Sequence, residues 1–153
     1  MFIYGKTAAN AIAVMSYLAA LPENELADTK KIAEARGISR ALTAKLLTQL
    51  ARAGLAQGLT GSGGGYRLGR PAQSIVLIDI VSLFEQTNTA SVCPFGKNWC
   101  GNNNPCPMHD SIDRTIKLGS HFLSNTYLAI FALPGMHVET LGKSLSAKEK
   151  TEA

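Results

Sequence analysis

The first regular pattern along the chain is an apolar face with helical spacing between Thr7 and Leu21. Its members recur at intervals of three and four residues, as on one side of an α-helix: Ala8, Ala11, Ile12, Met15, Leu18 and Ala19. Pro22 and Asn24 then interrupt the pattern. We therefore expect a helix over residues 7–21 that buries this face.

Two shorter helical segments follow, separated by a turn that contains a glycine. Lys30–Ala35 is expected to form the first, with Thr29 as its N-cap. Arg40–Ala53 is expected to form the second, with Ser39 as its N-cap and a glycine after its end. Two short helices joined in this way are typical of a helix-turn-helix.

Residues 55–68 carry five glycines, at positions 58, 61, 63, 64 and 65, and a short strand-like run at each end. The runs Gln57–Leu59 and Tyr66–Leu68 predict a β-hairpin, the wing of a winged helix. A glycine-rich phosphate loop is the alternative, but neither a Lys-Ser/Thr pair nor a helix follows the glycines. Residues 74–85 are expected to contain one more helix, with four inward-facing apolar side chains: Ile80, Val81, Leu83 and Phe84.

A seven-residue repeat of apolar and small side chains begins after Asp110, which we expect to cap a helix reaching Leu133. One row contains Ile112, Gly119, Thr126 and Leu133, and its companion row contains Ile116, Leu123 and Ile130. Such a helix, roughly 36 Å long, carries a coiled-coil-like seam. One small winged helix cannot cover it, so we expect the same helix of a second copy as its partner. Burial within its own chain is the alternative.

These elements predict a mainly α fold with a small β-hairpin wing, that is, a winged helix-turn-helix followed by a long dimerisation helix. Residues 1–70 would form the DNA-binding domain, residues 71–135 would hold a loop and the dimerisation helix, and residues 136–153 would be a disordered polar tail.

Composition is consistent with one globular protein. Hydrophobic residues make up 46% and charged residues 17% of the chain, which excludes general disorder. The longest apolar stretches are shorter than the ~20 residues that cross a membrane, and the N-terminus lacks the order of a signal peptide. We therefore expect a cytoplasmic protein with no membrane partner.

Positive charge is concentrated in the first 70 residues. This half has nine basic and four acidic residues, hence +5, whereas the remainder has six basic and seven acidic residues, hence −1. A basic half indicates a polyanionic partner. On the helix from Arg40, Leu42, Leu46, Leu50 and Ala53 would face the core, which leaves an outer face of Arg40, Ala41, Ala44, Lys45 and Thr48.

This outer face predicts how double-stranded DNA would be bound. Arg40, at the helix N-terminus, is the candidate for a guanine contact in the major groove. Lys45 and Lys6 would contact phosphate, and Thr29 would place a helix N-terminus against phosphate. Arg67 lies near the wing, whose glycines would let the hairpin approach the DNA backbone.

All three cysteines lie in one segment that is otherwise rich in Thr, Asn, Gly and Pro. Six residues separate Cys93 from Cys100 and five separate Cys100 from Cys106, and His109 follows after two more. Thiolates are soft ligands that favour Fe–S clusters, zinc or Cu(I), and four donors can complete a site. Spacing alone does not distinguish iron–sulfur from structural zinc, and His109 could instead face solvent. Metal-free redox thiols are a further alternative, whereas the lack of a recognisable nucleophile–base pair argues against an enzyme.

The order of these features resembles the Rrf family of bacterial winged-helix regulators, which includes IscR-, NsrR- and RirA-type members. The resemblance covers residues 2–133 and rests on the first helix, the helix-turn-helix with Ile38-Ser39, the wing sequence GGGYRL at 63–68, and the three cysteines before a long helix. It implies a homodimer that binds a palindromic operator, with Ser39, Thr60 and Tyr66 joining the DNA-binding set. It also implies an Fe–S cluster on Cys93, Cys100 and Cys106, whose loss, oxidation or nitrosylation would alter DNA binding.

The sequence departs from family members in three places. The first cysteine gap is six rather than five residues, and Ala8 stands where the nitric-oxide-sensing branch has an acidic ligand. His109 matches the ligand of the cluster-biogenesis branch, which favours [2Fe–2S] slightly over [4Fe–4S]. Ala44 and Thr60 replace an acid and an arginine of that branch, so its operator sequence cannot be transferred.

Overall fold

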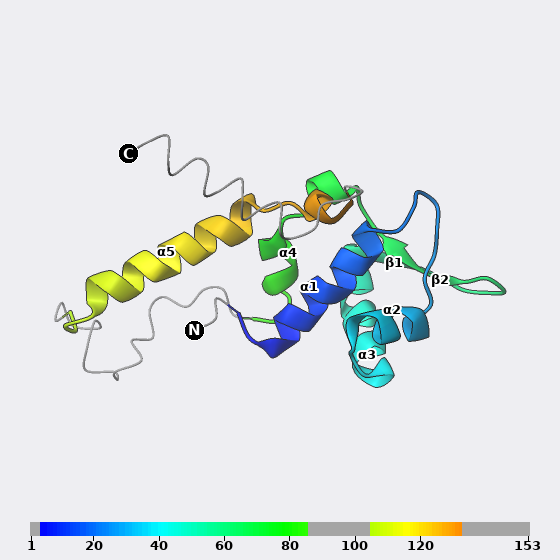
Figure 1. The fold of residues 1–153 in the computed structure, drawn as a ribbon, viewed down its shortest axis with the longest axis horizontal. Helices are drawn as coiled ribbons and strands as arrows, with labels where there is room; N and C mark the ends of the chain where they lie inside the picture. Colours follow the sequence, from blue (N-terminus) through cyan, green and yellow to red (C-terminus); the bar gives the residue numbers. More distant parts are fainter. Residues whose placement is uncertain (1–3, 86–104, 133–153) are drawn as a thin grey trace.

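The computed structural model describes residues 4–85 and 105–132 (Figure 1). The predicted fold class is confirmed, because the described residues are mostly helical and hold one two-stranded antiparallel hairpin. In chain order the elements are α1 (Lys6–Ala19), α2 (Thr29–Arg36), α3 (Arg40–Arg52), β1 (Ala56–Leu59), β2 (Gly65–Leu68), η1 (Ala72–Ser74), α4 (Leu77–Val81), α5 (His109–Asn125) and η2 (Leu128–Ala132). Within these ranges, no helix has the length and apolar composition needed to cross a membrane.

Helix α1 lies at the centre of the hydrophobic core. The predicted apolar face is buried, apart from the half-buried Ile12. Helices α2 and α3 pack on one side of α1 and α4 on the other (Figure 1). The core joins residues on both sides of position 70, because Ile75, Ile80 and Leu128 share it with α1.

The helix-turn-helix forms nearly as predicted, with one different cap. The side chain of Asp28, not Thr29, caps α2 by accepting a hydrogen bond from the Lys31 N–H at 2.8 Å. Both residue types can cap a helix, so the sequence alone could not choose between these neighbours. Gly37 ends α2 with a φ of 62°, and Ser39 Oγ caps α3 by accepting from the Leu42 N–H at 3.3 Å.

The wing is the hairpin of β1 and β2, and it pairs with a third segment from earlier in the chain. Gly58 lies opposite Tyr66, and Leu59 lies opposite Gly65. Tyr66 also exchanges two backbone hydrogen bonds with Ala27, of 2.8 and 3.0 Å. This bridge fixes the wing to the segment that leads into α2.

The helix predicted within residues 74–85 is shorter than that range. Only Leu77–Val81 is α-helical, and Ala72–Ser74 is a 3-10 turn. Ile80 and Val81 are buried and Phe84 is half-buried, but Leu83 is exposed, contrary to the prediction. The residues before α4 are extended because they pair with a distant segment: the Leu77 N–H donates to Thr126 O at 2.9 Å, and the Leu128 N–H donates to Ile75 O at 2.8 Å.

The same pairing ends α5 earlier than predicted. The helix runs from His109 to Asn125, about 26 Å, and not to Leu133. Thr126 becomes extended to pair with the segment before α4, and the chain then forms η2. Met108 occupies the N-cap position with no side-chain hydrogen bond, so Asp110 lies in the first turn and is not the cap.

The predicted seam of α5 is divided between the core and the surface. Gly119 and Leu123 are buried within this chain, which leaves them no exposed surface for a partner. Ile112 is half-buried and Ile116 is exposed. Thr126 and Ile130 lie beyond the helix end, and Leu133 lies outside the described residues.

Candidate functional site

Helix α3 presents a small, basic outer face. All five residues predicted for it are exposed: Arg40, Ala41, Ala44, Lys45 and Thr48. The opposite face is buried through Thr43, Leu46, Leu47 and Leu50, whereas Leu42 is only half-buried and Ala53 is exposed. Thr43 Oγ1 donates to Ser39 O at 3.1 Å, which satisfies the one polar side chain on the buried face. The outer face is therefore rigidly oriented by a well-packed helix.

Several basic residues of the N-terminal half are engaged within the chain. Arg36 donates through Nε to Ala13 O at 3.0 Å and lies over the Tyr17 ring at 5.4 Å. Lys30 pairs with Glu34, Arg67 Nε donates to Gln57 Oε1 at 2.9 Å, and Arg70 pairs with Asp79. Five have no such contact with the part of the chain that the structure describes: Lys6, Lys31, Arg40, Lys45 and Arg52. Four of these five belong to the helix-turn-helix.

An open groove of about 560 Å³ separates the C-terminal half of α3 from the wing. Thr29, Thr48, Arg52, Thr60 and Tyr66 are among its lining residues. Arg52 was not among the predicted DNA-binding residues, although its spacing could have revealed it. Lys45, Thr48 and Arg52 follow i, i+3, i+7 and so share one helix face.

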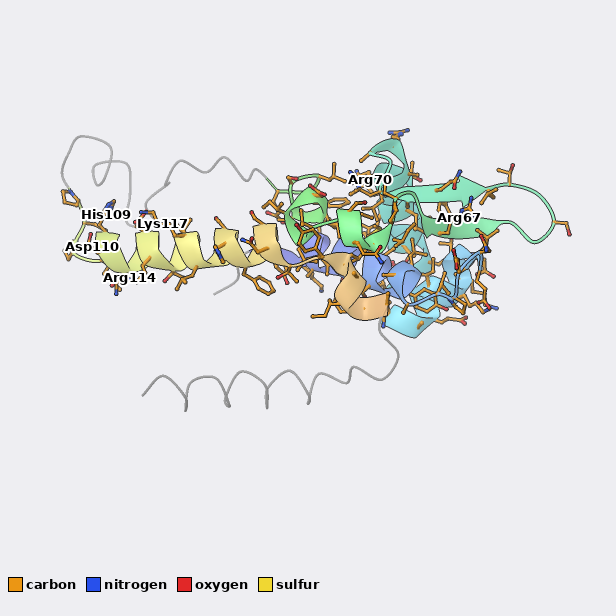
Figure 2. The ribbon with its side chains drawn as sticks, turned by 90° about the horizontal axis from the view of Figure 1, so that it is seen from above. Arg67, Arg70, His109, Asp110, Arg114 and Lys117 are labelled. Carbon is orange, nitrogen blue, oxygen red and sulfur yellow. The ribbon has the colours of Figure 1, made fainter. Side chains whose placement is uncertain are left out.

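The predicted wing residues differ in what they expose. Thr60 is exposed beside the tip, whereas Tyr66 is half-buried. The Tyr66 ring packs against Gly58, where an added Cβ atom would lie 3.0 Å from the ring. Arg67 lies on the wing, toward the opposite end of the molecule from His109, and Arg70 lies nearer the middle, at the base of the wing (Figure 2). The wing and α3 thus border one groove, while His109, at the start of α5, lies far from the wing (Figure 2).

Of the four predicted metal ligands, the structure describes Cys106 and His109, whereas Cys93 and Cys100 lie outside the described residues. Cys106 is a buried free thiol and His109 is half-buried. The His109 N–H donates to Cys106 O at 2.9 Å, a turn that brings both residues to the start of α5. Within residues 4–85 and 105–132, no group of three or more His, Cys, Asp or Glu side chains could hold a metal ion.

The first half of α5 carries both acidic and basic side chains. His109, Asp110, Arg114 and Lys117 gather at this end of the helix (Figure 2). The Lys117 ammonium, 2.7 Å from Asp113, donates a hydrogen bond that lowers the pKa of the Asp113 carboxyl, and the charge of His109 acts in the same direction.

The two described donors fit an Fe–S or zinc site. A turn keeps residues i and i+3 within about 7 Å of each other at Cα, close enough for Cys106 and His109 to share one metal centre. Soft thiolate and imidazole donors suit both iron–sulfur and zinc.

Residues 4–132 match the model of one protein family, Rrf2, described as an iron-dependent transcriptional regulator. The chain belongs to the Rrf2 family. Rrf2 regulators are DNA-binding transcription factors and not enzymes, which agrees with the winged helix and its basic outer face.

Solved structures share the fold of this Rrf2 protein. CymR of B. subtilis, described as the global cysteine regulator, is 21% identical, covers 86% of this chain and 97% of its own, and has a TM-score of 0.67. IscR of T. potens is 23% identical, covers 82% of each chain, and has a TM-score of 0.61. The oxidized form of Staphylococcus aureus CymR is 26% identical, covers 86% and 96%, and has a TM-score of 0.68. The predicted family and the winged-helix fold are therefore confirmed.

Proposed function

We propose that this Rrf2 protein is a homodimeric transcriptional regulator whose binding to a palindromic DNA operator is switched by an Fe–S cluster. The cluster would be held by Cys93, Cys100 and Cys106, with His109 as the fourth ligand. The observation that carries the proposal is the turn that places Cys106 and His109 at the start of α5, a helix with an exposed apolar surface.

DNA would bind across α3 and the wing. Arg40, the first residue of α3, is exposed without an ion pair to the described residues, as a side chain that reads a guanine must be. Lys45 and Arg52 would contact phosphates from the outer face of α3, with Arg52 beside the α3–wing groove. Lys6, Thr29, Ser39 and Thr60 would add contacts that position the protein. The half-buried Tyr66 and the hydrogen-bonded Arg67 would chiefly hold the wing in shape.

The donor set favours iron over zinc when it is taken with the family description, which names iron dependence. When bound, an Fe–S cluster supplies a redox-active and labile centre, so its state can report iron, oxidants or nitric oxide. A histidine ligand favours the [2Fe–2S] form slightly over [4Fe–4S]. The buried Cys106 thiolate would be one of the three cysteine ligands beside the α5 N-terminus.

Dimerisation would use the apolar surface that α5 leaves uncovered. Met108, Ile116, Leu118 and Phe122 are 51, 45, 66 and 47% exposed, and α5 extends away from the body of the molecule (Figure 1). Exposed apolar side chains gathered on one helix mark an interaction surface. A two-fold pair of α5 helices would cover them and fix the spacing of the two α3 helices, which must match half-sites about one DNA turn apart.

Cluster binding is tested by anaerobic purification followed by absorption spectroscopy and iron and sulfide analysis. We expect a coloured protein that loses its cluster when any one of the three cysteines is changed to Ala. His109→Cys should keep a cluster with a shifted spectrum, and His109→Ala should change the spectrum or the redox behaviour. His121→Ala, which removes another histidine of α5, is the matched control. A colourless protein with zinc would support the structural-zinc alternative, and a colourless metal-free protein would support redox thiols.

The switch is tested by titrating one selected operator with holo and apo protein at fixed salt. We expect different affinities, because the state of the cluster at the start of α5 would alter how the two α3 helices are spaced. Equal affinities would reject the sensor and leave a DNA-binding protein with a structural metal.

A further inference from the structure

The ion pair between Arg70 and Asp79 differs from the other ion pairs of the described residues. Arg70 Nη2 lies 3.7 Å from Asp79 Oδ2, and it joins the end of the wing to α4. The other two pairs, in α2 and in α5, each join residues four apart in one helix. Of these three ion pairs within residues 4–85 and 105–132, Arg70–Asp79 is therefore the one that connects two different parts of the fold, the wing and α4.

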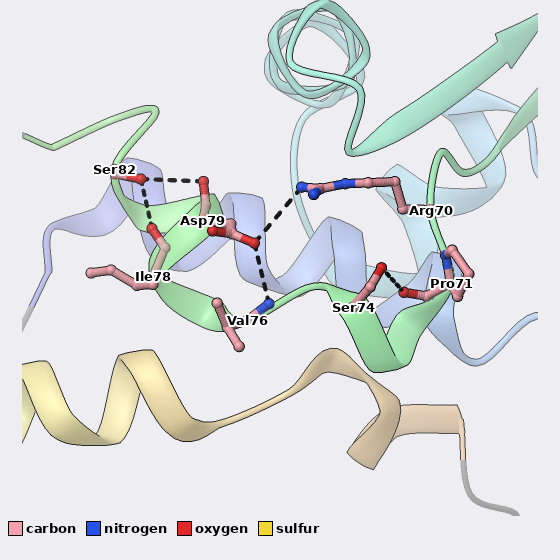
Figure 3. A network of polar contacts seen from close by, with 7 residues as sticks. All are labelled: Arg70, Pro71, Ser74, Val76, Ile78, Asp79 and Ser82. Atoms are coloured by element: carbon pink, nitrogen blue, oxygen red, sulfur yellow. Dashed lines mark hydrogen bonds and ion pairs between the residues drawn. The ribbon is translucent and has the colours of Figure 1, made fainter.

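The Arg70 side of this link is fixed to the base of the wing. The Gly69 N–H donates to Leu55 O at 2.9 Å, which closes the hairpin at its base. A side chain on Gly69 would begin 2.4 Å from Gly54 O, so the two ends of the hairpin are in close contact. After Arg70, Ser74 Oγ donates to Pro71 O at 2.8 Å and orders the connection to α4 (Figure 3). The Arg70 backbone therefore moves with the wing.

The Asp79 side is fixed to the end of α5. The same oxygen, Oδ2, accepts a hydrogen bond from the Val76 N–H at 3.4 Å (Figure 3). Val76 lies opposite Tyr127 in the short bridge that ends α5, between the Leu77–Thr126 and Leu128–Ile75 hydrogen bonds. Leu123, in the last turns of α5, and Leu128, next to the bridge, are both buried in the shared core, so we expect a displacement of α5 to move the bridge.

We infer that Asp79 is a positioning residue that couples the position of α5 to the position of the wing. One carboxylate oxygen, Asp79 Oδ2, contacts both Arg70, at the base of the wing, and Val76, whose bridge to Tyr127 holds the segment after α5. This inference rests on the proposed function only for the signal, which is the state of the cluster. The connection between α5 and the wing depends on the contacts of Asp79 with Arg70 and Val76. Because both side chains are partly exposed, the pair has little effect on overall stability and can be changed without unfolding the protein.

Two variants each neutralise one side of the charge pair; the Asp79 variant keeps the side-chain shape, and the Arg70 variant keeps a polar side chain. Asp79→Asn retains an oxygen that can accept from the Val76 N–H but loses the negative charge, and Arg70→Gln removes the cation. We expect either change to bring the ratio of holo to apo operator affinity about threefold closer to one, within the range for an exposed ion pair. The double variant should be no worse than either single variant, since both remove the same interaction. Lys117→Gln, which breaks an ion pair within α5, is the matched control.

A second measurement does not need the cluster. Spin labels introduced as noncanonical amino acids at Ser62, in the wing tip, and Ser120, on the exposed side of α5, report the distance between wing and helix in the apo protein. We expect a broader distance distribution in Asp79→Asn and Arg70→Gln than in the wild type or Lys117→Gln, with unchanged thermal unfolding. Unchanged distributions in both variants would overturn the inference. Equal holo and apo affinities of the wild type would instead reject the proposed function, and the label distances would still decide the role of Asp79.

Discussion

At the scale of the residue, three consecutive glycines of the wing meet three different requirements. Gly63 has a φ of 78°, which side chains disfavour. A side chain on Gly64 would begin 2.4 Å from Leu59 O, and one on Gly65 would begin 2.8 Å from Ala27 O. The sequence predicted a hairpin from these glycines but not the reason for Gly65, because Ala27 lies in a distant part of the sequence.

Gly65→Ala should therefore destabilise the protein. The added methyl group would press on the Ala27 backbone, which the bridge to Tyr66 holds in place, and such overpacking costs about 1–3 kcal/mol. Urea unfolding followed by circular dichroism measures the change. Ser62→Ala in the exposed tip is the control and should leave the midpoint unaltered. Equal midpoints for the two variants would mean that the segment around Ala27 can move away.

At the scale of the element, side-chain periodicity predicted where helices form better than where they end. The boundaries of α1, α2 and α3 agree with the prediction within about two residues, because their ends have local signals such as caps and glycines. The end of α5 has no such signal. Its seven-residue repeat continues past Asn125, but the backbone of Thr126 pairs with residues before α4. A pairing between distant segments cannot be recognised from the spacing within one of them.

This division of α5 predicts opposite results for two leucines. Leu118, 66% exposed, lies on the proposed dimer surface, so Leu118→Glu should give folded monomers in sedimentation velocity. Leu123 is 3% exposed in the core, so Leu123→Ala should lower the free energy of unfolding by about 2–5 kcal/mol. A Leu118→Glu protein that remains dimeric would place the dimer interface elsewhere.

At the scale of the whole molecule, the wing and the start of α5 lie at opposite ends (Figures 1 and 2). The DNA-binding face was predictable in part, because helical periodicity alone separates the buried and outer faces of α3. The α3–wing groove with Arg52 depends on how the hairpin folds back, which periodicity does not reveal. The cysteine spacing predicted a metal site beside the long helix. The Arg70–Asp79 contact, on which the inferred coupling of α5 to the wing depends, joins two different elements and has no signature in the sequence.

DNA affinity should fall steeply with salt, because the free cations of the helix-turn-helix replace counterions on phosphates. Lys45→Ala and Arg52→Ala should weaken binding to all sequences alike and reduce the salt slope by about 1, whereas Arg40→Ala should cost about 1–3 kcal/mol and relax sequence preference. Fluorescence anisotropy with operator and random DNA over a range of salt concentrations measures both effects. Lys117→Ala on α5 removes the same charge as a control, and a slope change as large as that of Lys45→Ala would contradict this assignment.

The bridge between Val76 and Tyr127 also has a consequence for the order of folding. Its partners are separated by about 50 residues, so their pairing requires closure of a long loop, whereas the α2–α3 contacts and the β1–β2 pairing join residues close in sequence. All three cysteines lie inside this loop. A cluster that joined Cys93 to Cys106 would shorten the free length of the loop and lower the entropy lost on closure. Cluster assembly before this closure would then speed the docking of α5 and the segment after it onto the shared core.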